Sequence, residues 1–169
     1  MMHYGVALMA VFVPGLLAES PGVMNVCDVL ANLQGVRNRV IAVRGQLVGT
    51  DEGSYLIGNR CQESLVTNGY QWPNPIPIFL IPPDSGLVEK PDSPRPKVVA
   101  DRGLDAALAR VEMTPGLKIW VTYIGKLETR ERFEIVLRGD GKKVPYGFGH
   151  MNSCPAQLVY RVLKDIVVK

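Results

Sequence analysis

Residues 39–49 alternate between apolar and polar side chains, with the period of two that is typical of a half-buried strand. The apolar face consists of Ile41, Val43, Gly45 and Leu47. A turn at 50–53 separates this strand from a second apolar segment at 54–58. Strand, turn and strand together predict a β-hairpin.

The same order returns later in the chain. A strand pattern at 118–128 is followed by four polar residues and then by the apolar segment 133–137, which predicts a second hairpin. Each long strand carries a glycine near its middle, Gly45 in the first and Gly125 in the second. Because glycine weakens a strand interior, its recurrence indicates a bulge or a sharp bend, the feature by which one long strand serves two halves of a small barrel.

Two helices and two further strands complete the pattern. Apolar residues at helical spacing predict helices over 26–33 and 103–112, with Asp101 as the N-cap of the second. Residues 76–81 form a short apolar run among prolines, which indicates an edge strand. The tail at 156–168 fits a helix by its spacing and a strand by its β-branched content, and we expect a strand.

Composition places the chain among ordinary globular proteins. Of its 169 residues, 47% are hydrophobic and 21% are charged, so we expect neither a disordered polymer nor a multi-span membrane protein. At this length a single domain is the default. The 17 Gly and 13 Pro exceed average usage and favour short strands joined by turns over a helical bundle.

The first residues have the pattern of an export signal. No Asp, Glu, Lys or Arg occurs between Met1 and Ala18, and an apolar run at 5–13 is broken by Pro14 and Gly15. We expect a signal peptide at 1–18 and a single mature domain at 19–169, periplasmic or secreted and without a membrane span. The segment before the run lacks Lys and Arg, so an N-terminal strand or helix buried in the core is the alternative.

Export would favour pairing among the three cysteines, Cys27, Cys61 and Cys154. We expect a disulfide between Cys27 and Cys61, because the first begins the predicted helix and the second follows the second strand, near one edge of the same hairpin. Three buried, unpaired cysteines are the alternative. No CxxC motif occurs, and His150 with Cys154 is the only close pair of ligand-type residues, so we expect no metal site and no cofactor.

The order of these elements resembles the OB-fold, a five-stranded Greek-key barrel with its helix between the third and fourth strands. The resemblance covers residues 40–137 and rests on the element order together with Gly45 and Gly125. It implies a mainly β fold, an OB-like barrel of five to six strands with one helix between strands 3 and 4, a short N-terminal helix and a C-terminal extension from Val144. A different β-sandwich or barrel is the alternative. The chain is also similar to small exported bacterial proteins of unassigned role, from which no functional residues carry over.

OB-folds commonly bind oligosaccharides or oligonucleotides through aromatic rings on the second and third strands. The corresponding strands and the adjoining loop carry Tyr55, Tyr70, Trp72 and Phe79. These four rings predict an aromatic binding platform. In the alternative interpretation Phe79 belongs to the core, Tyr55 is half-buried, and Trp72 fixes the loop in place.

The charge pattern disfavours nucleic acid as the ligand. The net charge is only +3, and residues 118–143 combine seven basic with four acidic side chains. Interleaved charges of this kind are typical of a solvated edge.

A catalytic centre has little support. Ser153 and Cys154 follow His150 closely, which makes a small hydrolase centred on His150 one hypothesis, but the glycine-rich stretch 147–152 is more typical of a turn. No nucleophile-elbow, zinc-protease, P-loop or dinucleotide-binding motif occurs. We therefore expect a non-catalytic exported binding or structural module of unknown ligand, with a protein or a glycan of the cell envelope as its partner. An oligosaccharide- or oligonucleotide-binding barrel is the first alternative, and the hydrolase is the second.

Overall fold

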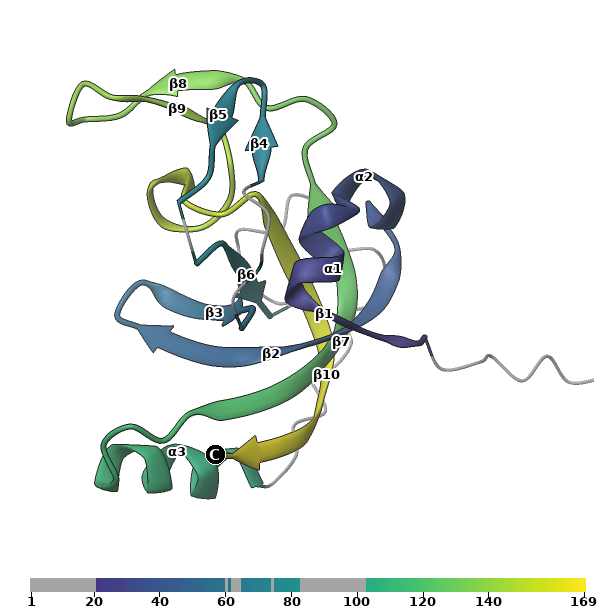
Figure 1. Cartoon of the computed structure of the whole chain (residues 1–169), viewed down its shortest axis with the longest axis vertical. Helices are drawn as coiled ribbons and strands as arrows, with labels where there is room; N and C mark the ends of the chain where they lie inside the picture. Colours follow the sequence, from purple (N-terminus) through teal and green to yellow (C-terminus); the bar gives the residue numbers. More distant parts are fainter. Residues whose placement is uncertain (1–20, 60, 62–64, 74, 83–102) are drawn as a thin grey trace, which may run out of the picture.

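A computed structural model describes residues 21–59, 61, 65–73, 75–82 and 103–169 of the protein. The predicted signal peptide at 1–18 and the predicted cap Asp101 lie outside the described residues. Within them the fold is mainly β, as the sequence predicts (Figure 1).

The elements follow one another along the chain in an order close to the predicted one. The first half contains β1 (Val23–Asn25), α1 (Val26–Ala31), α2 (Leu33–Val36), β2 (Val40–Thr50), β3 (Gly53–Ile57), β4 (Val66–Thr67), β5 (Tyr70–Gln71) and β6 (Pro77–Ile81). The second half contains α3 (Gly103–Met113), β7 (Ile119–Thr129), β8 (Ile135–Leu137), β9 (Lys143–Pro145), the 3₁₀ helix η1 (His150–Asn152) and β10 (Ala156–Val168).

Six strands form one mixed sheet in the order β1-β2-β3-β6-β10-β7. The pairings of β1 with β2 and of β6 with β10 are parallel, and the others are antiparallel. β2 also pairs with β7, so the pairings lead from β2 through β3, β6, β10 and β7 back to β2. Two small sheets, β4-β5 and β8-β9, lie at the same end of the molecule (Figure 1).

The first predicted hairpin is confirmed, and the second is wrong. β2 and β3 pair from Gln46 with Ile57 to Thr50 with Gly53. β7 does not pair with the segment after it, because β8 pairs with β9 and β7 pairs with β2 and β10. The reason is burial: Ile135 and Leu137 of β8 are 43% and 71% exposed, whereas β10 brings buried apolar side chains to β7. The tail at 156–168 is thus a strand of the main sheet, as expected from its β-branched content.

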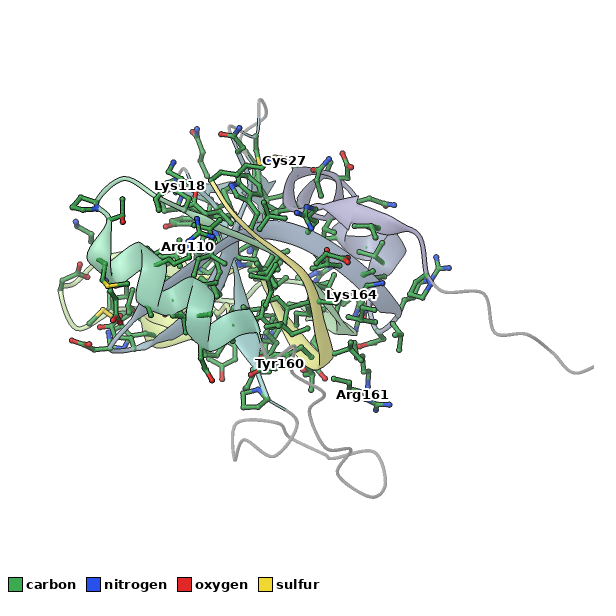
Figure 2. All side chains as sticks on the ribbon, turned by 90° about the horizontal axis from the view of Figure 1, so that it is seen from below. Cys27, Arg110, Lys118, Tyr160, Arg161 and Lys164 are labelled. Atoms are coloured by element: carbon green, nitrogen blue, oxygen red, sulfur yellow. A yellow bond between two sulfur atoms is a disulfide. The ribbon has the colours of Figure 1, made fainter. Side chains whose placement is uncertain are left out.

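The predicted irregularity at Gly125 is confirmed, although the extra residue lies in the partner strand. Tyr160 of β10 pairs with Gly125 and Val162 pairs with Ile124, so Arg161 between them has no partner in β7. A Cβ at Gly125 would overlap the backbone carbonyl oxygen of Val159. The bulge therefore brings the two backbones close together and leaves the exposed Arg161 side chain directed outward (Figure 2).

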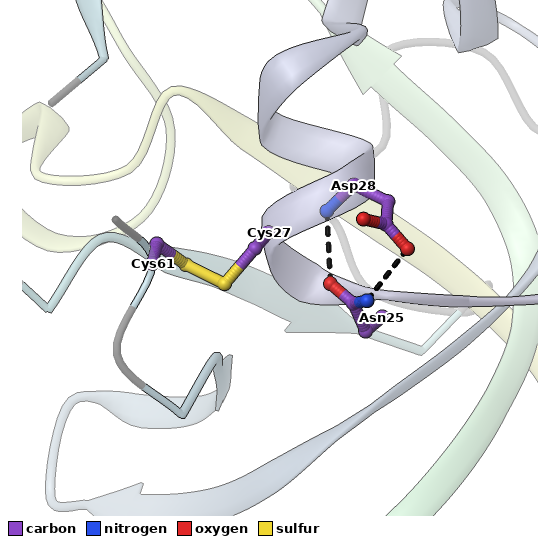
Figure 3. The surroundings of a disulfide bond; sticks show 4 residues. All are labelled: Asn25, Cys27, Asp28 and Cys61. Carbon is purple, nitrogen blue, oxygen red and sulfur yellow. Dashed lines mark hydrogen bonds between the residues drawn. A yellow bond between two sulfur atoms is a disulfide. The ribbon is translucent and has the colours of Figure 1, made fainter. Parts of the chain in front are cut away.

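Both predicted helices are present. The first is divided, because α1 ends at Ala31 and α2 begins at Leu33. The Asn25 side chain caps α1 by accepting a hydrogen bond from the Asp28 amide at 2.9 Å (Figure 3). α3 contacts β10 and β7, and Ala107 is the one buried residue of this helix.

The interior divides into two apolar clusters. The larger one joins α1 and α2 to the main sheet and includes Val26, Val43, Leu56, Val121 and Leu158. The smaller one consists of Tyr55, Phe79, Ile81, Cys154 and Val159, with Phe148 packed against it. The smaller cluster adjoins the candidate site described below, since Phe79 and Phe148 both line that site.

The predicted disulfide between Cys27 and Cys61 is confirmed (Figure 3), and Cys154 is free and buried. The bridge connects the first turn of α1 to the chain that follows β3. A Cβ at Gly58 would lie 2.7 Å from both sulfur atoms, so the missing side chain at this position leaves room for the bridge. A disulfide is consistent with an oxidising compartment.

None of the helices that the structure describes is long and apolar enough to span a membrane.

Candidate functional site

A pocket of about 840 Å³ lies beside one end of the main sheet. Two connections line it: the β2–β3 turn contributes Glu52, and the segment between β7 and β10 contributes Arg130, residues 146–150 and Asn152. The strands and their neighbours add Asn38, Phe79, Lys126, Glu128, Thr129 and Gln157. The lining thus offers aromatic rings together with charged and amide groups that donate and accept hydrogen bonds.

Local contacts fix the segment between β7 and β10 as a wall of the pocket. Phe148 and Cys154 exchange two backbone hydrogen bonds, of 2.8 and 3.0 Å. A Cβ at Gly147 would overlap the Cys154 carbonyl oxygen, so this turn requires glycine at that position. The buried Thr129 hydroxyl donates a hydrogen bond to the Pro155 carbonyl at 2.9 Å, where β7 and β10 begin to pair.

Arg130 occupies an unusual environment in this pocket. Its Cζ atom lies 4.5 Å from the centroid of the Tyr146 ring and 4.5 Å from that of the Phe148 ring. A guanidinium over an aromatic face is held by the negative potential of the ring. Its Nε atom is buried and has no hydrogen-bond partner. The rings thus hold the cation in place, and its Nε–H donor stays unsatisfied.

The two carboxylates of the pocket already have partners. Glu52 Oε1 lies 3.1 Å from His150 Nε2, and this contact joins the β2–β3 turn to η1 across the pocket. Glu128 Oε2 accepts a hydrogen bond of 2.5 Å from the Gln157 side chain. Neither carboxylate forms an ion pair with Arg130, so this guanidinium has no anionic partner among the described residues.

Cys154 lies behind this wall as a neutral thiol. It is completely buried, and burial raises its pKa to about 11, with the Ser153 hydroxyl acting weakly in the opposite direction. The Ser153 oxygen is 3.7 Å from the Cys154 sulfur. A thiol with this pKa is un-ionised at neutral pH, which makes it a poor nucleophile.

The structure places the four predicted platform residues in two separate pairs. Tyr55 packs against Phe79 with ring centroids 5.5 Å apart, and Tyr70 packs against Trp72 at 5.4 Å. Trp72 also contacts Phe133, and its indole nitrogen donates a hydrogen bond to the Thr67 hydroxyl at 2.7 Å.

Three of these rings are largely covered, since Tyr55, Trp72 and Phe79 are 8%, 3% and 7% exposed. Burial, together with Cys154 and Glu52 nearby, raises the pKa of the Tyr55 phenol. Of these four residues, only Phe79 lines the pocket described above. Stacking of a ligand on these four rings stays a prediction, and it would require the covered rings to become accessible.

The sequence interpretation missed Arg130, Tyr146 and Phe148. Arg130 was expected in a hairpin turn with other charged residues, and the two rings follow it 16 and 18 positions later. No local spacing predicts a contact at that separation. The available signal was the length of the polar, glycine-containing stretch from 138 to 153, which is long for a simple connection.

The described residues include no group of three or more His, Cys, Asp or Glu side chains arranged to hold a metal ion. His150 and Cys154 do not converge on one another's side chains, because His150 faces Glu52 whereas Cys154 is buried in the smaller cluster. Comparison with known proteins adds no relative: the chain matches no protein-family model, no curated protein and no solved structure.

Proposed function

We propose that the protein is a non-catalytic binding module with an OB-like barrel, whose ligand occupies the pocket between the β2–β3 turn and the segment from Arg130 to Pro155. One observation carries the proposal: these two connections line the same pocket. In OB-folds, the loop between the first two strands and the loop between the last two are the ones that bind oligosaccharides and oligonucleotides.

The strand pairings support the barrel. β2, β3, β6, β7 and β10 each pair with two of the others, and the pairings return to β2. α3 follows β6 and precedes β7, which is the place of the helix between the third and fourth strands. In this assignment β10 is the fifth strand of the barrel. The C-terminal extension predicted from the sequence is therefore part of the barrel from residue 156 onward.

The charges of the pocket favour an oligosaccharide over an oligonucleotide. Glu52 and Glu128 line it beside Lys126 and Arg130, so it lacks the positive excess that neutralises a phosphate backbone. Asn38, Asn152 and Gln157 add amides that donate to and accept from hydroxyl groups. Aromatic rings next to such amides suit the mixed polar and apolar faces of a sugar.

Two observations favour binding over hydrolysis. The Cys154 thiol stays protonated at neutral pH, and the Nε2 atom of His150 is engaged by Glu52. The disulfide is consistent with export, so a glycan of the cell envelope is the partner that we propose.

A pair of adjacent substitutions tests the site. Glu52 lines the pocket, whereas Asp51 belongs to the same exposed turn and is not part of the lining. We expect Glu52→Trp to fill the pocket and weaken the binding of an oligosaccharide found by screening at least about tenfold, a change of about 1.4 kcal/mol. Asp51→Trp is the matched control and should leave affinity unchanged.

The screen uses neutral and acidic oligosaccharides together with a (dT)8 oligonucleotide. Binding is measured by titration calorimetry at ligand concentrations up to about 1 mM. A Kd of that size corresponds to a binding free energy of only about −4 kcal/mol. Equal binding by Glu52→Trp and wild type places the ligand elsewhere and contradicts the proposal. Absence of binding to every probe contradicts it as well. Cleavage of a bound probe by the wild type, lost in His150→Ala, would establish the hydrolase instead.

A further inference from the structure

We infer that the pocket recognises a carboxylate-bearing sugar, with the Arg130 guanidinium as the group that binds the carboxylate. This inference rests on the proposed function and narrows its ligand from oligosaccharides in general to acidic oligosaccharides. The observation behind it is a cation that lines the pocket, lies against two aromatic rings and makes no ion pair with the carboxylates of the pocket.

The two ring contacts at 4.5 Å orient the guanidinium, but a ring face accepts none of the hydrogen bonds that lie in the guanidinium plane. Because the Nε atom is buried, an anionic ligand would bind the outer edge of the guanidinium and gain the charge attraction there.

The neighbouring carboxylates do not replace such a ligand. Glu52 is engaged with His150, and Glu128 accepts from Gln157. Among the described residues, these two carboxylates of the pocket thus leave Arg130 without an anionic partner. The pocket also suits the rest of a sugar, because the Asn38 and Asn152 side-chain amides line it and can form hydrogen bonds with hydroxyl groups.

The chemistry of the pocket favours a single carboxylate over a phosphate or a polyanion. A carboxylate is planar and matches the two parallel donors of a guanidinium edge. Glu52 and Glu128 line the same pocket and would repel a doubly charged group more strongly than a singly charged one. An uronic acid presents one carboxylate on a ring that is otherwise covered with hydroxyl groups, which is the combination that this lining fits.

The experiment compares acids with their own methyl esters. The probes are trigalacturonate, trimannuronate and a hyaluronate tetrasaccharide, each paired with its fully methyl-esterified form, and (dT)8 serves as a polyanion. Because esterification removes the charge and leaves the sugar otherwise intact, the wild-type protein alone isolates the carboxylate contact. We expect at least one acid to bind about tenfold to a hundredfold more tightly than its ester.

Substitutions identify the residue. We expect Arg130→Gln to reduce the affinity for the acid to that of the ester and Arg130→Lys to retain part of the preference, because lysine keeps the charge but loses the planar pair of donors. Arg132→Gln is the matched control, since Arg132 is exposed on the same segment and does not line the pocket. Thermal unfolding of each variant shows whether the fold of the protein is retained.

The outcomes separate this inference from the proposed function. If acid and ester bind equally and Glu52→Trp weakens both, the pocket binds sugars without the carboxylate contact, and this inference is wrong while the proposed function stands. If an acid is preferred but Glu52→Trp binds it normally, both are wrong. Failure of all three acids to bind, or binding of (dT)8 alone, overturns the acidic-sugar inference.

Discussion

Gly125 lies where β7 and the bulged part of β10 approach each other most closely. A Cβ at this position would overlap the Val159 carbonyl oxygen and lie 2.6 Å from the Tyr160 Cα atom, so backbone rather than a mobile side chain would have to move. We expect Gly125→Ala to lower the free energy of unfolding by about 1–3 kcal/mol, the usual cost of overpacking. Urea unfolding measures the change.

Gly49 provides the matched control for Gly125, because it belongs to β2 and nothing lies within 4 Å of a Cβ built on it. We expect Gly49→Ala to change the free energy of unfolding by no more than about 0.5 kcal/mol. Equal effects of the two substitutions would contradict the close approach at the bulge.

The Cys154 thiol predicts a pH dependence of stability. Burial raises its pKa from 9.0 to about 11, so the unfolded chain loses this proton at a lower pH than the folded chain. The contribution to stability is therefore fully present below pH 9 and is lost as the pH rises from 9 toward 11. We expect this loss to be about 1.4 kcal/mol per pH unit within that window.

Urea unfolding of the wild type and of Cys154→Ala isolates the thiol, because the other titrating groups are common to both. The free energy of unfolding of the wild type should fall relative to that of the variant between about pH 8 and pH 10, in the direction required by proton linkage. A constant difference over this range would show that the thiol is not buried in the folded state.

At the scale of elements, the disulfide connects α1 to the chain beyond β3. It closes a loop with a sequence separation of 34 residues. By loop-closure entropy, the Cys27→Ala/Cys61→Ala variant should lose roughly 3 to 4 kcal/mol of unfolding free energy. Reduction of the wild type should produce the same loss in urea unfolding, and so should reduction of Cys154→Ala, which keeps the bridge. The Cys27→Ala/Cys61→Ala variant should be insensitive to reductant. Equal stability of the oxidised and reduced wild type would contradict a stabilising bridge.

Element type could be predicted from the sequence where periodicity was strong, whereas strand partners could be predicted only across a short turn. The alternation at 39–49 identified β2, and the turn that follows it identified its hairpin with β3. The same alternation identified β7 but assigned it the next apolar segment, 133–137, as a partner. Periodicity describes one strand alone, whereas pairing depends on which distant strand buries more apolar surface, and here that strand is β10.

The candidate site was less predictable for the same physical reason. Its residues come from the β2–β3 turn, the end of β7 and the segment before β10, so they meet only after β10 has paired with both β6 and β7. The four aromatic residues chosen from the sequence lie on or beside predicted strands, where a large ring is more often needed to fill the core. Three of them are covered in this structure.

At the scale of the whole molecule, strands differ in how many partners they have: β2, β3, β6, β7 and β10 each pair with at least two strands, whereas each strand of the small sheets pairs with one. β7 pairs with β2 on one side and β10 on the other, whereas β8 pairs with β9 alone. Ile135 and Leu137 of β8 are also exposed, so little apolar burial opposes local opening of that hairpin. Opening of β7 requires the loss of two pairings and of much of the larger apolar cluster.

Amide hydrogen exchange tests this division of stability. We expect the amides of β7 to exchange only through global unfolding, and those of β8 and β9 to exchange on the order of a hundredfold faster through local opening. β1 is an internal control, because it pairs with β2 on one side and should show intermediate protection. Protection of β8 and β9 equal to that of β7 would mean that the hairpin is part of the cooperative core, and fast exchange throughout β7 would mean that its pairings with β2 and β10 do not both form in solution.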